Sequence, residues 1–273
     1  MPSPSERVIT PKVLREWPLP DPSGGKESRG TVLVVGGSKF TPGAVLLAGE
    51  AALRAGAGRL QLAVAEETTI ALSIAVPEAK VVGLPGTELA EGADVIALGP
   101  GLDDIGRTTE LMRDVLGAAG PDTAVVLDAY ALGALSKDAS LLPRPGRAVL
   151  TPNLVEAEHL LGRAPGDDPG PAAAELAERY GAVVSLYGHI ASPDGRRWVE
   201  ESGDVGLGTS GSGDARAGIV AGLLARGAAP AQAACWGAYV HAVSGQRLAL
   251  RHGRTGFLAR ELVEEVAHTI ATV

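Results

Sequence analysis

The sequence has 273 residues, of which 45% are hydrophobic and 21% are charged, enough for one large domain or two small ones with a sizeable core. A net charge of −8 and an aromatic content of 3% argue against nucleic-acid binding, and a single cysteine, Cys235, excludes an intramolecular disulfide. No apolar run is long enough for a membrane span or a signal-peptide core, so we expect a cytoplasmic protein that binds small molecules and neither nucleic acid nor a membrane.

Residues 1–29 are rich in proline, serine and charged residues, and we expect an irregular N-terminal leader with one short helix around Pro11–Glu16. From Thr31 onward, short β-branched runs alternate with helical patterns rich in alanine and leucine. The predicted strands are Thr31–Val35, Arg59–Val64, Lys80–Val82, Val95–Leu98, Val125–Leu127 and Val149–Leu150. The predicted helices between them are Ala44–Ala55, Glu66–Ala75 and Arg107–Ala119. This alternation indicates a mostly parallel sheet covered by helices on both faces.

The second half of the chain begins with helices at Asn153–Leu161 and Ala172–Tyr180. Next come three short strands, Val183–Leu186, Ile190–Ser192 and Arg197–Val199, and the Asp194-Gly195 turn between the last two predicts a hairpin that ends the sheet. The predicted closing helices are Ser212–Ala225, Pro230–Ala249 and Leu258–Thr269. We therefore expect a single domain over residues 30–273, and the final block of helices fits the competing TIM barrel poorly.

The segment Gly206–Asp214 holds four glycines and precedes a predicted helix. Such small residues let backbone N–H groups surround an anion, and the helix adds its positive N-terminal end. We therefore predict a phosphate-binding loop here, with a helix N-cap at Asp214 as the structural alternative. The G-x-G-x-x-G at Gly206–Gly211 is not a dinucleotide fingerprint, because no acidic residue follows it at the required spacing.

Other glycine turns follow the strands predicted near Val35 and Leu98. They are Gly36–Ser38, with Pro42–Ala44 after it, and Gly99–Gly101. In a parallel sheet the ends of these strands share one edge, where close backbone approach suits a ligand. The sequence therefore predicts a ligand site at that edge.

Polar residues follow two further strands. Asn153 and Glu156 form a pattern typical of a helix capping box, and the functional alternative places Glu156 near a metal–phosphate group. Asp128 ends its strand, where it would orient a substrate or cap the next helix. His189 and His241 are expected to be structural.

Taken together, these motifs resemble the ribokinase-like superfamily, and within it the ADP- or ATP-dependent NAD(P)H-hydrate dehydratases. The stretches that carry the resemblance are Val35–Ser38, Pro42–Gly58, Val76–Ala79, Leu98–Leu102, Val126–Ala129 and Gly208–Gly227. The resemblance implies a three-layer α/β/α sandwich. It also implies repair of the hydrated cofactors NADHX and NADPHX, in which a nucleotide phosphoryl group activates the ring hydroxyl for elimination.

The resemblance also assigns residues and partners. Asp214 would be the catalytic base, with ADP or ATP as co-substrate and Mg²⁺ as a further requirement. The substrate pocket would include Ala44, Gly101, Asn153 and Asp214. The nucleotide would meet Tyr187, Gly188, His189, Ile190, Ala191, Gly211, Ser212 and Gly213. A homo-oligomer is expected, and a separate NAD(P)HX epimerase would act in the same pathway.

The sequence departs from the family pattern at three places. The family usually carries His-Pro-Gly-Glu where this chain has Asn153–Glu156, a Lys-Gly pair where it has Tyr187-Gly188, and apolar residues where it has Ala215-Arg216. The Asn-x-x-Glu element favours a small-molecule kinase of the superfamily, acting on a hydroxymethyl or vitamin-type substrate. Tyr187 removes a positive charge and favours a descendant that binds a nucleotide without turnover.

Overall fold

The computed structural model describes residues 6–21, 23 and 25–273, so that residues 1–5, 22 and 24 of the predicted leader lie outside the described residues. The strands are β1 (Arg7–Val8), β2 (Thr31–Val35), β3 (Arg59–Val64), β4 (Ala79–Gly83), β5 (Val95–Leu98), β6 (Ala124–Leu127), β7 (Ala148–Leu150), β8 (Val183–Leu186), β9 (His189–Ala191) and β10 (Arg197–Val199). They form one sheet in the order β1-β10-β9-β8-β7-β6-β5-β2-β3-β4. Only β9 runs antiparallel to its neighbours within the described part of the chain. The prediction of a mostly parallel sheet is confirmed, and its two open edges exclude a TIM barrel.

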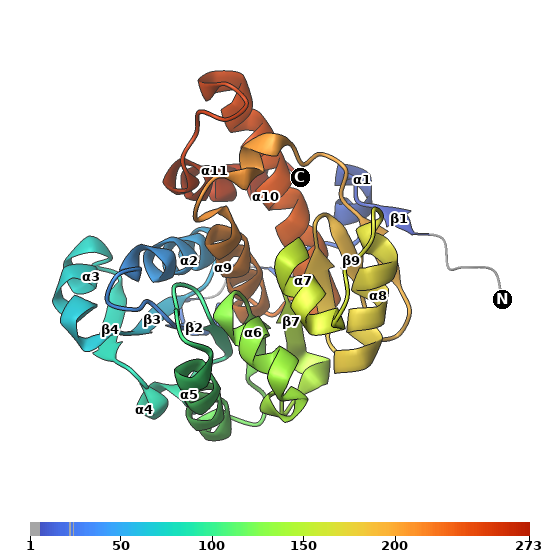
Figure 1. Cartoon of the computed structure of the whole chain (residues 1–273). Helices are drawn as coiled ribbons and strands as arrows, with labels where there is room; N and C mark the ends of the chain where they lie inside the picture. Colours follow the sequence, from blue (N-terminus) through green and yellow to red (C-terminus); the bar gives the residue numbers. More distant parts are fainter. Residues whose placement is uncertain (1–5, 22, 24) are drawn as a thin grey trace.

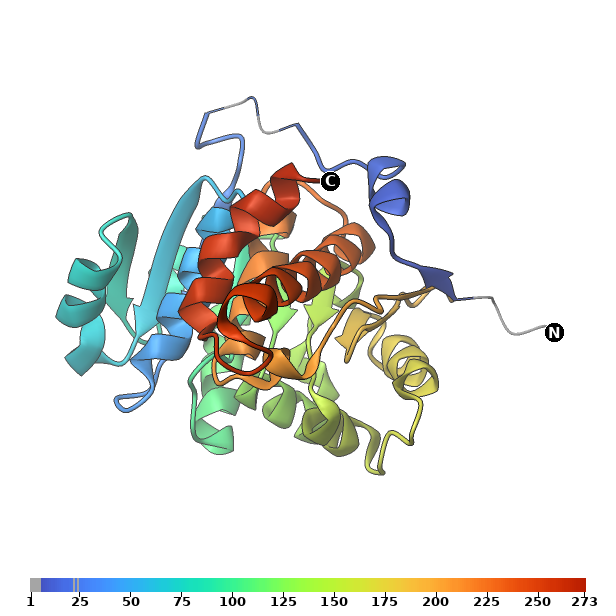
Figure 2. The ribbon, with the colours of Figure 1, turned by 90° about the horizontal axis from the view of Figure 1, so that it is seen from above.

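Helices cover both faces of this sheet, which gives the predicted three layers (Figures 1 and 2). The α-helices are α1 (Pro11–Arg15), α2 (Pro42–Arg54), α3 (Thr69–Ala75), α4 (Thr87–Ala90), α5 (Ile105–Ala118), α6 (Tyr130–Lys137), α7 (Leu154–Leu161), α8 (Pro169–Tyr180), α9 (Ser212–Ala225), α10 (Pro230–His252) and α11 (Ala259–Ala271). Short 3₁₀ helices occur at Glu66–Thr68, Ala139–Leu141, Pro145–Arg147 and Val205–Gly208. None of the described helices is both long and apolar enough to cross a membrane.

The sheet separates two hydrophobic cores. Alternate residues of β2 point to opposite faces, so Val32 and Val34 pack with α2, α9, α10 and α11, whereas Leu33 and Val35 pack with α4 to α8. All five residues of β2 are buried, as expected for a central strand of a parallel sheet covered on both faces.

Two glycines of α9 allow α2 and α9 to pack with their backbones in close contact. A Cβ atom on Gly218 would lie 2.1 Å from the carbonyl oxygen of Ala48, and one on Gly222 would lie 2.2 Å from that of Ala52. Both distances are far below van der Waals contact. The packing therefore fixes α9 against α2 and positions the N-terminus of α9 at the edge of the sheet.

The N-terminal segment corrects one prediction, because the hairpin does not end the sheet. Strand β1 pairs in parallel with β10 and extends the sheet beyond it (Figure 1). The ring of Trp17 stacks on Trp198 at 5.8 Å between centroids, and its carbonyl oxygen accepts a hydrogen bond from Trp236 Nε1. The predicted short helix is confirmed as α1, and ordered structure begins before Thr31 because these contacts attach the segment to the domain.

Candidate active site

The glycine turns after β2 and β5 meet at the carboxyl edge of the sheet, the edge where the parallel strands end. The N–H of Gly37 donates to the carbonyl oxygen of Pro100 at 2.8 Å, and the N–H of Ser38 donates to that of Gly101 at 2.7 Å. A Cβ atom on Gly101 would lie 2.9 Å from the Cβ of Ala44. The structure thus brings together Ala44 and Gly101, two of the predicted substrate-pocket residues.

The glycine loop before α9 lies at the same edge. Gly211 has a φ of 86°, in the left-handed region that glycine adopts readily, and it precedes the first helical residue. A Cβ atom on Gly213 would meet no atom within 4 Å, so the backbone of this first turn is open to a ligand. Helix α9 points its positive end into this space.

Asp214 lies in the first turn of α9 and makes no side-chain cap hydrogen bond. Asp214 is therefore not the N-cap of α9, because Gly211 occupies that position. Burial, together with the neighbouring carboxylates of Asp128 and Glu156, raises the pKa of Asp214 to about 7. A carboxyl group that titrates near neutrality is suited to proton transfer at physiological pH.

Asp128, which follows β6, and Glu156, in the first turn of α7, both act electrostatically on Asp214. Asp128 is 6% exposed, and its Oδ1 accepts a hydrogen bond from the hydroxyl of Thr151 at 2.8 Å. Burial raises the pKa of Asp128, and burial together with the charge of Asp128 raises that of Glu156 to about 7. Three carboxyl groups therefore share the site, and their titrations are coupled.

Arg216, one turn into α9, supplies the positive charge of the cluster. Its guanidinium donates to the carbonyl oxygens of Thr151 and Pro152. The charge of Arg216 opposes the rise in the pKa of both Asp128 and Glu156, whereas its own pKa is lowered by burial. Its Nε is buried without a hydrogen-bond partner. Arg216 thus ties the loop after β7 to α9 and stabilises ionised carboxylates beside Asp214.

The expected capping box of α7 is present. The Asn153 side chain accepts from the N–H of Glu156, and the Glu156 carboxylate accepts from the N–H of Asn153, both at 2.9 Å. Because Glu156 also interacts with Asp128 and Arg216, its capping role and a role in the site are compatible. The box uses the Asn153 oxygen, so its side-chain NH₂ is the group that Asn153 would offer to a ligand.

The segment Tyr187–Ala191 forms the turn and the strand after β8. Tyr187, with a φ of 48°, is 70% exposed, and Gly188 has a φ of 89°. The side chains of Ile190 and Ala191 are buried in the two hydrophobic cores, and the ring of His189 lies 3.0 Å from Glu6. Tyr187 therefore has the most exposed side chain of the segment predicted to contact the nucleotide.

His241 lies beside the site and contacts Ser212, a contact that the sequence did not indicate. Its Nε2 lies 2.8 Å from the Ser212 hydroxyl and 3.1 Å from the Ser212 carbonyl oxygen, and it is only 9% exposed. Burial and the charge of Arg216 lower the pKa of His241 to about 3, so the ring is neutral. The ring is buried and hydrogen-bonded as expected for a structural histidine, and it anchors the glycine loop. A histidine alone on a long helix gives no sequence signal for that contact.

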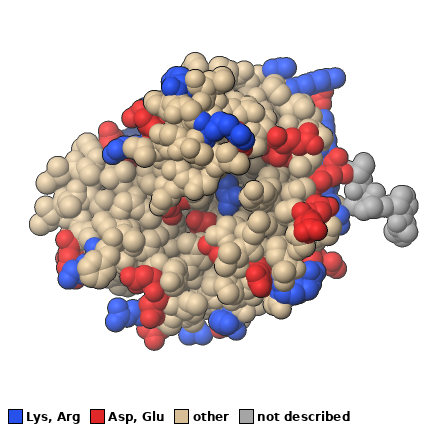
Figure 3. All heavy atoms as spheres, turned by 45° about the horizontal axis from the view of Figure 1, so that its top comes forward, with Lys and Arg blue, Asp and Glu red and all other residues tan. Residues whose placement is uncertain are grey.

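Figure 3 shows a face of the molecule with acidic side chains and a basic one gathered in a recess near its centre. Within residues 6–21, 23 and 25–273, no three His, Cys, Asp or Glu side chains form a cluster that could hold a metal ion.

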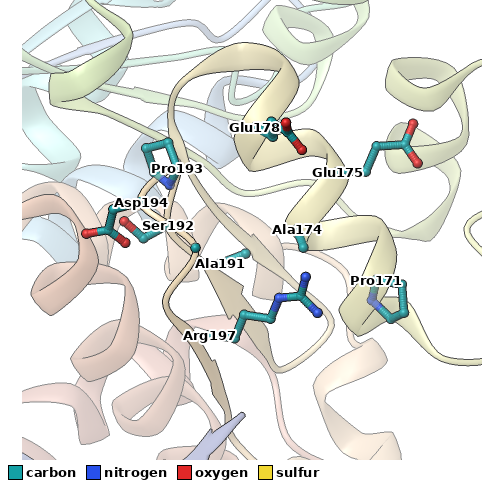
Figure 4. A pocket seen from close by; sticks show the side chains of 10 residues that line it. Pro171, Ala174, Glu175, Glu178, Ala191, Ser192, Pro193, Asp194 and Arg197 are labelled. Atoms are coloured by element: carbon teal, nitrogen blue, oxygen red, sulfur yellow. The ribbon is translucent and has the colours of Figure 1, made fainter. Parts of the chain in front are cut away.

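Two other hollows lie at the opposite, amino edge of the sheet. One, of about 520 Å³, lies between α8 and the turn after β9 and is lined by Glu175, Glu178, Asp194 and Arg197 among others (Figure 4). The second has a volume of about 660 Å³ and lies beside the starts of β3 and β4. Neither contains Asp214, so the candidate site is the open carboxyl edge.

Comparison with known proteins gives concordant matches. The family model described as NAD(P)H-hydrate dehydratase matches residues 32–268. An ADP-dependent (S)-NAD(P)H-hydrate dehydratase of Xanthomonas campestris is 44% identical, over 97% of this chain and 96% of that protein. A bifunctional NAD(P)H-hydrate repair enzyme of Escherichia coli is 33% identical over 91% of this chain, which spans only 49% of its length.

Solved structures agree with this. A Bacillus subtilis ADP/ATP-dependent NAD(P)H-hydrate dehydratase, co-crystallized with ATP/Mg²⁺, matches with a TM-score of 0.84 and 28% identity, over 98% of this chain and 99% of that one. A ribokinase-like superfamily protein of Enterococcus faecalis matches with a TM-score of 0.88 at 24% identity, over 98% of this chain and 96% of that one. The predicted ribokinase-like fold is confirmed.

Proposed function

The chain belongs to the NAD(P)H-hydrate dehydratase family, and we propose from this that it is a nucleotide-dependent hydro-lyase that returns NADHX and NADPHX to NADH and NADPH. The nucleotide supplies a phosphoryl group that turns the ring hydroxyl into a good leaving group. Phosphate then leaves with assistance from the electron pair of the ring nitrogen, whereas hydroxide would leave poorly. The chain has to bind both molecules, remove one proton and stabilise negative charge.

The position of Asp214 is the observation that carries this proposal at the atomic level. Its carboxyl group titrates near pH 7 and lies in the helix turn whose backbone is open at Gly213. We assign Asp214 as the base that accepts the hydroxyl proton of the substrate. The amides of Gly211, Ser212 and Gly213 would stabilise the charge on the transferring phosphoryl group.

The substrate would lie along the carboxyl edge, between the turn after β5 and the start of α7. A side chain at Gly101 would overlap Ala44, so only backbone atoms and the Ala44 methyl group line this part of the site. Such a lining suits the close approach of a flat ring. The side-chain NH₂ of Asn153 would donate to the substrate. Asparagine and histidine can both donate a hydrogen bond, so Asn153 would supply the donor at the position where histidine is usual in the family.

The nucleotide would contact the Tyr187-Gly188 turn and the glycine loop. Tyr187 cannot supply the positive charge of the usual lysine, but Arg216 places a guanidinium within the carboxylate cluster. Mg²⁺ would reach the site on the nucleotide phosphates, and Glu156 is the carboxylate that would hold it there. Mg²⁺ would there neutralise phosphate charge.

The kinase and binding-only alternatives are not favoured, since the family model and the Xanthomonas relative both indicate the dehydratase. We further propose that the protein works in the cytoplasm as a homo-oligomer, and that a separate epimerase supplies the correct epimer. The family resemblance supports the oligomer and the epimerase, and size-exclusion chromatography with light scattering tests the former.

Product analysis tests the proposed function. The purified protein is incubated with hydrated NADH or NADPH, Mg²⁺ and either ADP or ATP, and the products are separated by chromatography. We expect inorganic phosphate and NAD(P)H to form in equal amounts. Accumulation of a stable phosphorylated metabolite instead would identify a kinase.

A further inference from the structure

The hollow of about 660 Å³ at the amino edge, which we term the basic hollow, has a cationic lining. Its basic side chains are Lys26, Arg29, Arg54, Arg59 and Lys80, and its acidic ones are only Glu50 and Glu78. The lining therefore carries an excess of positive charge, although the chain as a whole has a net charge of −8. A cationic concave surface concentrates anions.

Most of these cations have no carboxylate partner. Arg59 pairs with Glu27 at 2.6 Å, whereas Lys26, Arg29, Arg54 and Lys80 form no ion pair within 4.0 Å in the part of the chain that the structure describes. Arg54 interacts with Glu50 in the same lining, so the charge available to a ligand is mainly that of Lys26, Arg29 and Lys80.

Two buried polar atoms of the lining also have no hydrogen-bond partner. Arg29 Nε is a donor and Gln61 Oε1 is an acceptor, and both are shielded from solvent. A buried polar atom without a hydrogen-bond partner destabilises the folded protein. A ligand with an anionic oxygen for Arg29 and a hydroxyl donor for Gln61 would satisfy both atoms.

A further guanidinium adds to the positive charge next to the hollow. Arg226, at the end of α9, donates to the carbonyl oxygen of Pro20 at 2.9 Å and keeps its Nε buried and unpartnered. Burial, and then the like charge of Arg29, lower the pKa of Arg226. An anion bound between them would relieve this repulsion.

The basic hollow is separate from the active site. Its residues Arg59, Leu60 and Gln61 begin β3, whereas the active-site loops follow the strand ends. Strand β3 has six residues, so its two ends lie about 16 Å apart at ~3.3 Å per residue. One small ligand cannot contact both sites.

We propose that the basic hollow binds a phosphate monoester of a polyhydroxylated small molecule, with the phosphate on Arg29 and its cationic neighbours and a hydroxyl on Gln61. Sugar phosphates have this chemistry, and the hollow is large enough for one. A charged hydrogen bond to a guanidinium is strong and directional, so Arg29 is the main determinant of binding.

Calorimetric titration at constant ionic strength tests the proposal, with ribose 5-phosphate as the probe and ribose as the neutral control. We expect the wild-type protein to bind the phosphate and not ribose. Arg29→Met should weaken binding about tenfold or more. Lys137→Met removes the same single positive charge at the exposed end of α6, away from the hollow, and should bind like the wild type.

Several outcomes would overturn the proposal: no binding to the wild type, equal binding to Arg29→Met, or an equal loss in the control variant. Displacement of ribose 5-phosphate by ADP would also contradict it, because it would place the phosphate in the active site. Lys80 is exposed, so Lys80→Met provides a second test should Arg29→Met fail to fold. Lys80→Met should lower the affinity and leave dehydratase turnover unchanged.

Discussion

At the residue scale, the central feature is a set of three carboxyl groups that are costly to ionise together. Asp128, Glu156 and Asp214 interact at the carboxyl edge, and the pKa values of Glu156 and Asp214 are both raised to about 7. Arg216 offsets part of this repulsion. The site therefore favours the ionised form of Asp214 less than water does, which makes Asp214 a stronger base and a destabilising residue.

The cost of ionising Asp214 should appear as a pH dependence of the free energy of unfolding. Because the folded state holds a proton on Asp214 up to about pH 7 and the unfolded state loses it near pH 4, the free energy of unfolding falls as pH rises through this window. Allowing for its partial exposure, we expect Asp214→Asn to raise the free energy of unfolding by about 1–2 kcal/mol at pH 8, with little change at pH 4. Urea unfolding at both pH values measures this, and equal effects at both would contradict the assignment.

The contact between His241 and Ser212 predicts a positioning role. His241→Phe removes the partner of the Ser212 hydroxyl and should lower kcat about tenfold through a displaced glycine loop. His241→Gln retains polar atoms and should recover part of this loss. Steady-state kinetics with separate kcat and KM values provide the measurement. An unchanged kcat in a folded His241→Phe protein would limit His241 to a structural role.

At the level of single residues, the sequence predicted Asp214, Asn153 and Glu156, since their motifs are local. It did not predict that Arg216 binds the carbonyl oxygens after β7, or that His241 contacts Ser212. Each of these contacts joins segments far apart in the chain. No pattern within one element contains that information.

At the scale of elements, α2 and α9 set the geometry of the site, since α2 carries Ala44 and α9 carries Asp214. Their close packing depends on Gly218 and Gly222. We expect Gly222→Ala to destabilise the protein by about 1–3 kcal/mol, because its Cβ would overlap the backbone of Ala52. Gly117→Ala is the matched control within α5, where a Cβ meets no atom within 4 Å and the effect should be neutral or slightly stabilising. Chemical denaturation compares the two variants, and similar effects would contradict the packing argument.

Most elements were predicted with small errors at their ends. Strands β2, β3, β5 and β10 and helix α9 agree with their predicted bounds, because each combines a clear periodicity with glycine or polar residues at its ends. Helix α6 was not predicted. It follows Ala129, whose φ of 49° is a conformation that alanine rarely adopts and that sequence patterns do not indicate.

At the scale of the whole molecule, the N-terminal segment extends the sheet by one strand and forms one of its edges. The sequence predicted its helix but not β1, because two exposed residues form a strand only when β10 is already in place. The parallel architecture was predictable, since it depends on the regular alternation of buried strands and helices. The long-range attachment of Trp17 was not.

That attachment predicts a stability effect without a catalytic one. Trp17→Ala removes the stacking on Trp198 and disturbs the site where Gln232 and Trp236 donate to the carbonyl oxygen of Trp17. We expect a loss of about 2–3 kcal/mol in the free energy of unfolding. Turnover per folded molecule should stay unchanged, since the active site lies at the carboxyl edge. A change in both quantities would show that the segment also supports the site.

Nucleotide-dependent turnover and the role of Asp214 are tested together in one assay. The recovery of reduced-nicotinamide absorbance from hydrated NADH is followed, with nucleotide and Mg²⁺, for the wild type and Asp214→Asn. The wild type should recover the absorbance only when nucleotide is present. Asp214→Asn should remain folded and lose at least about 10²-fold of this rate, the usual contribution of a general base. A wild type without nucleotide-dependent recovery would contradict the proposed dehydratase activity. A fully active Asp214→Asn protein would contradict the assignment of Asp214 as the base.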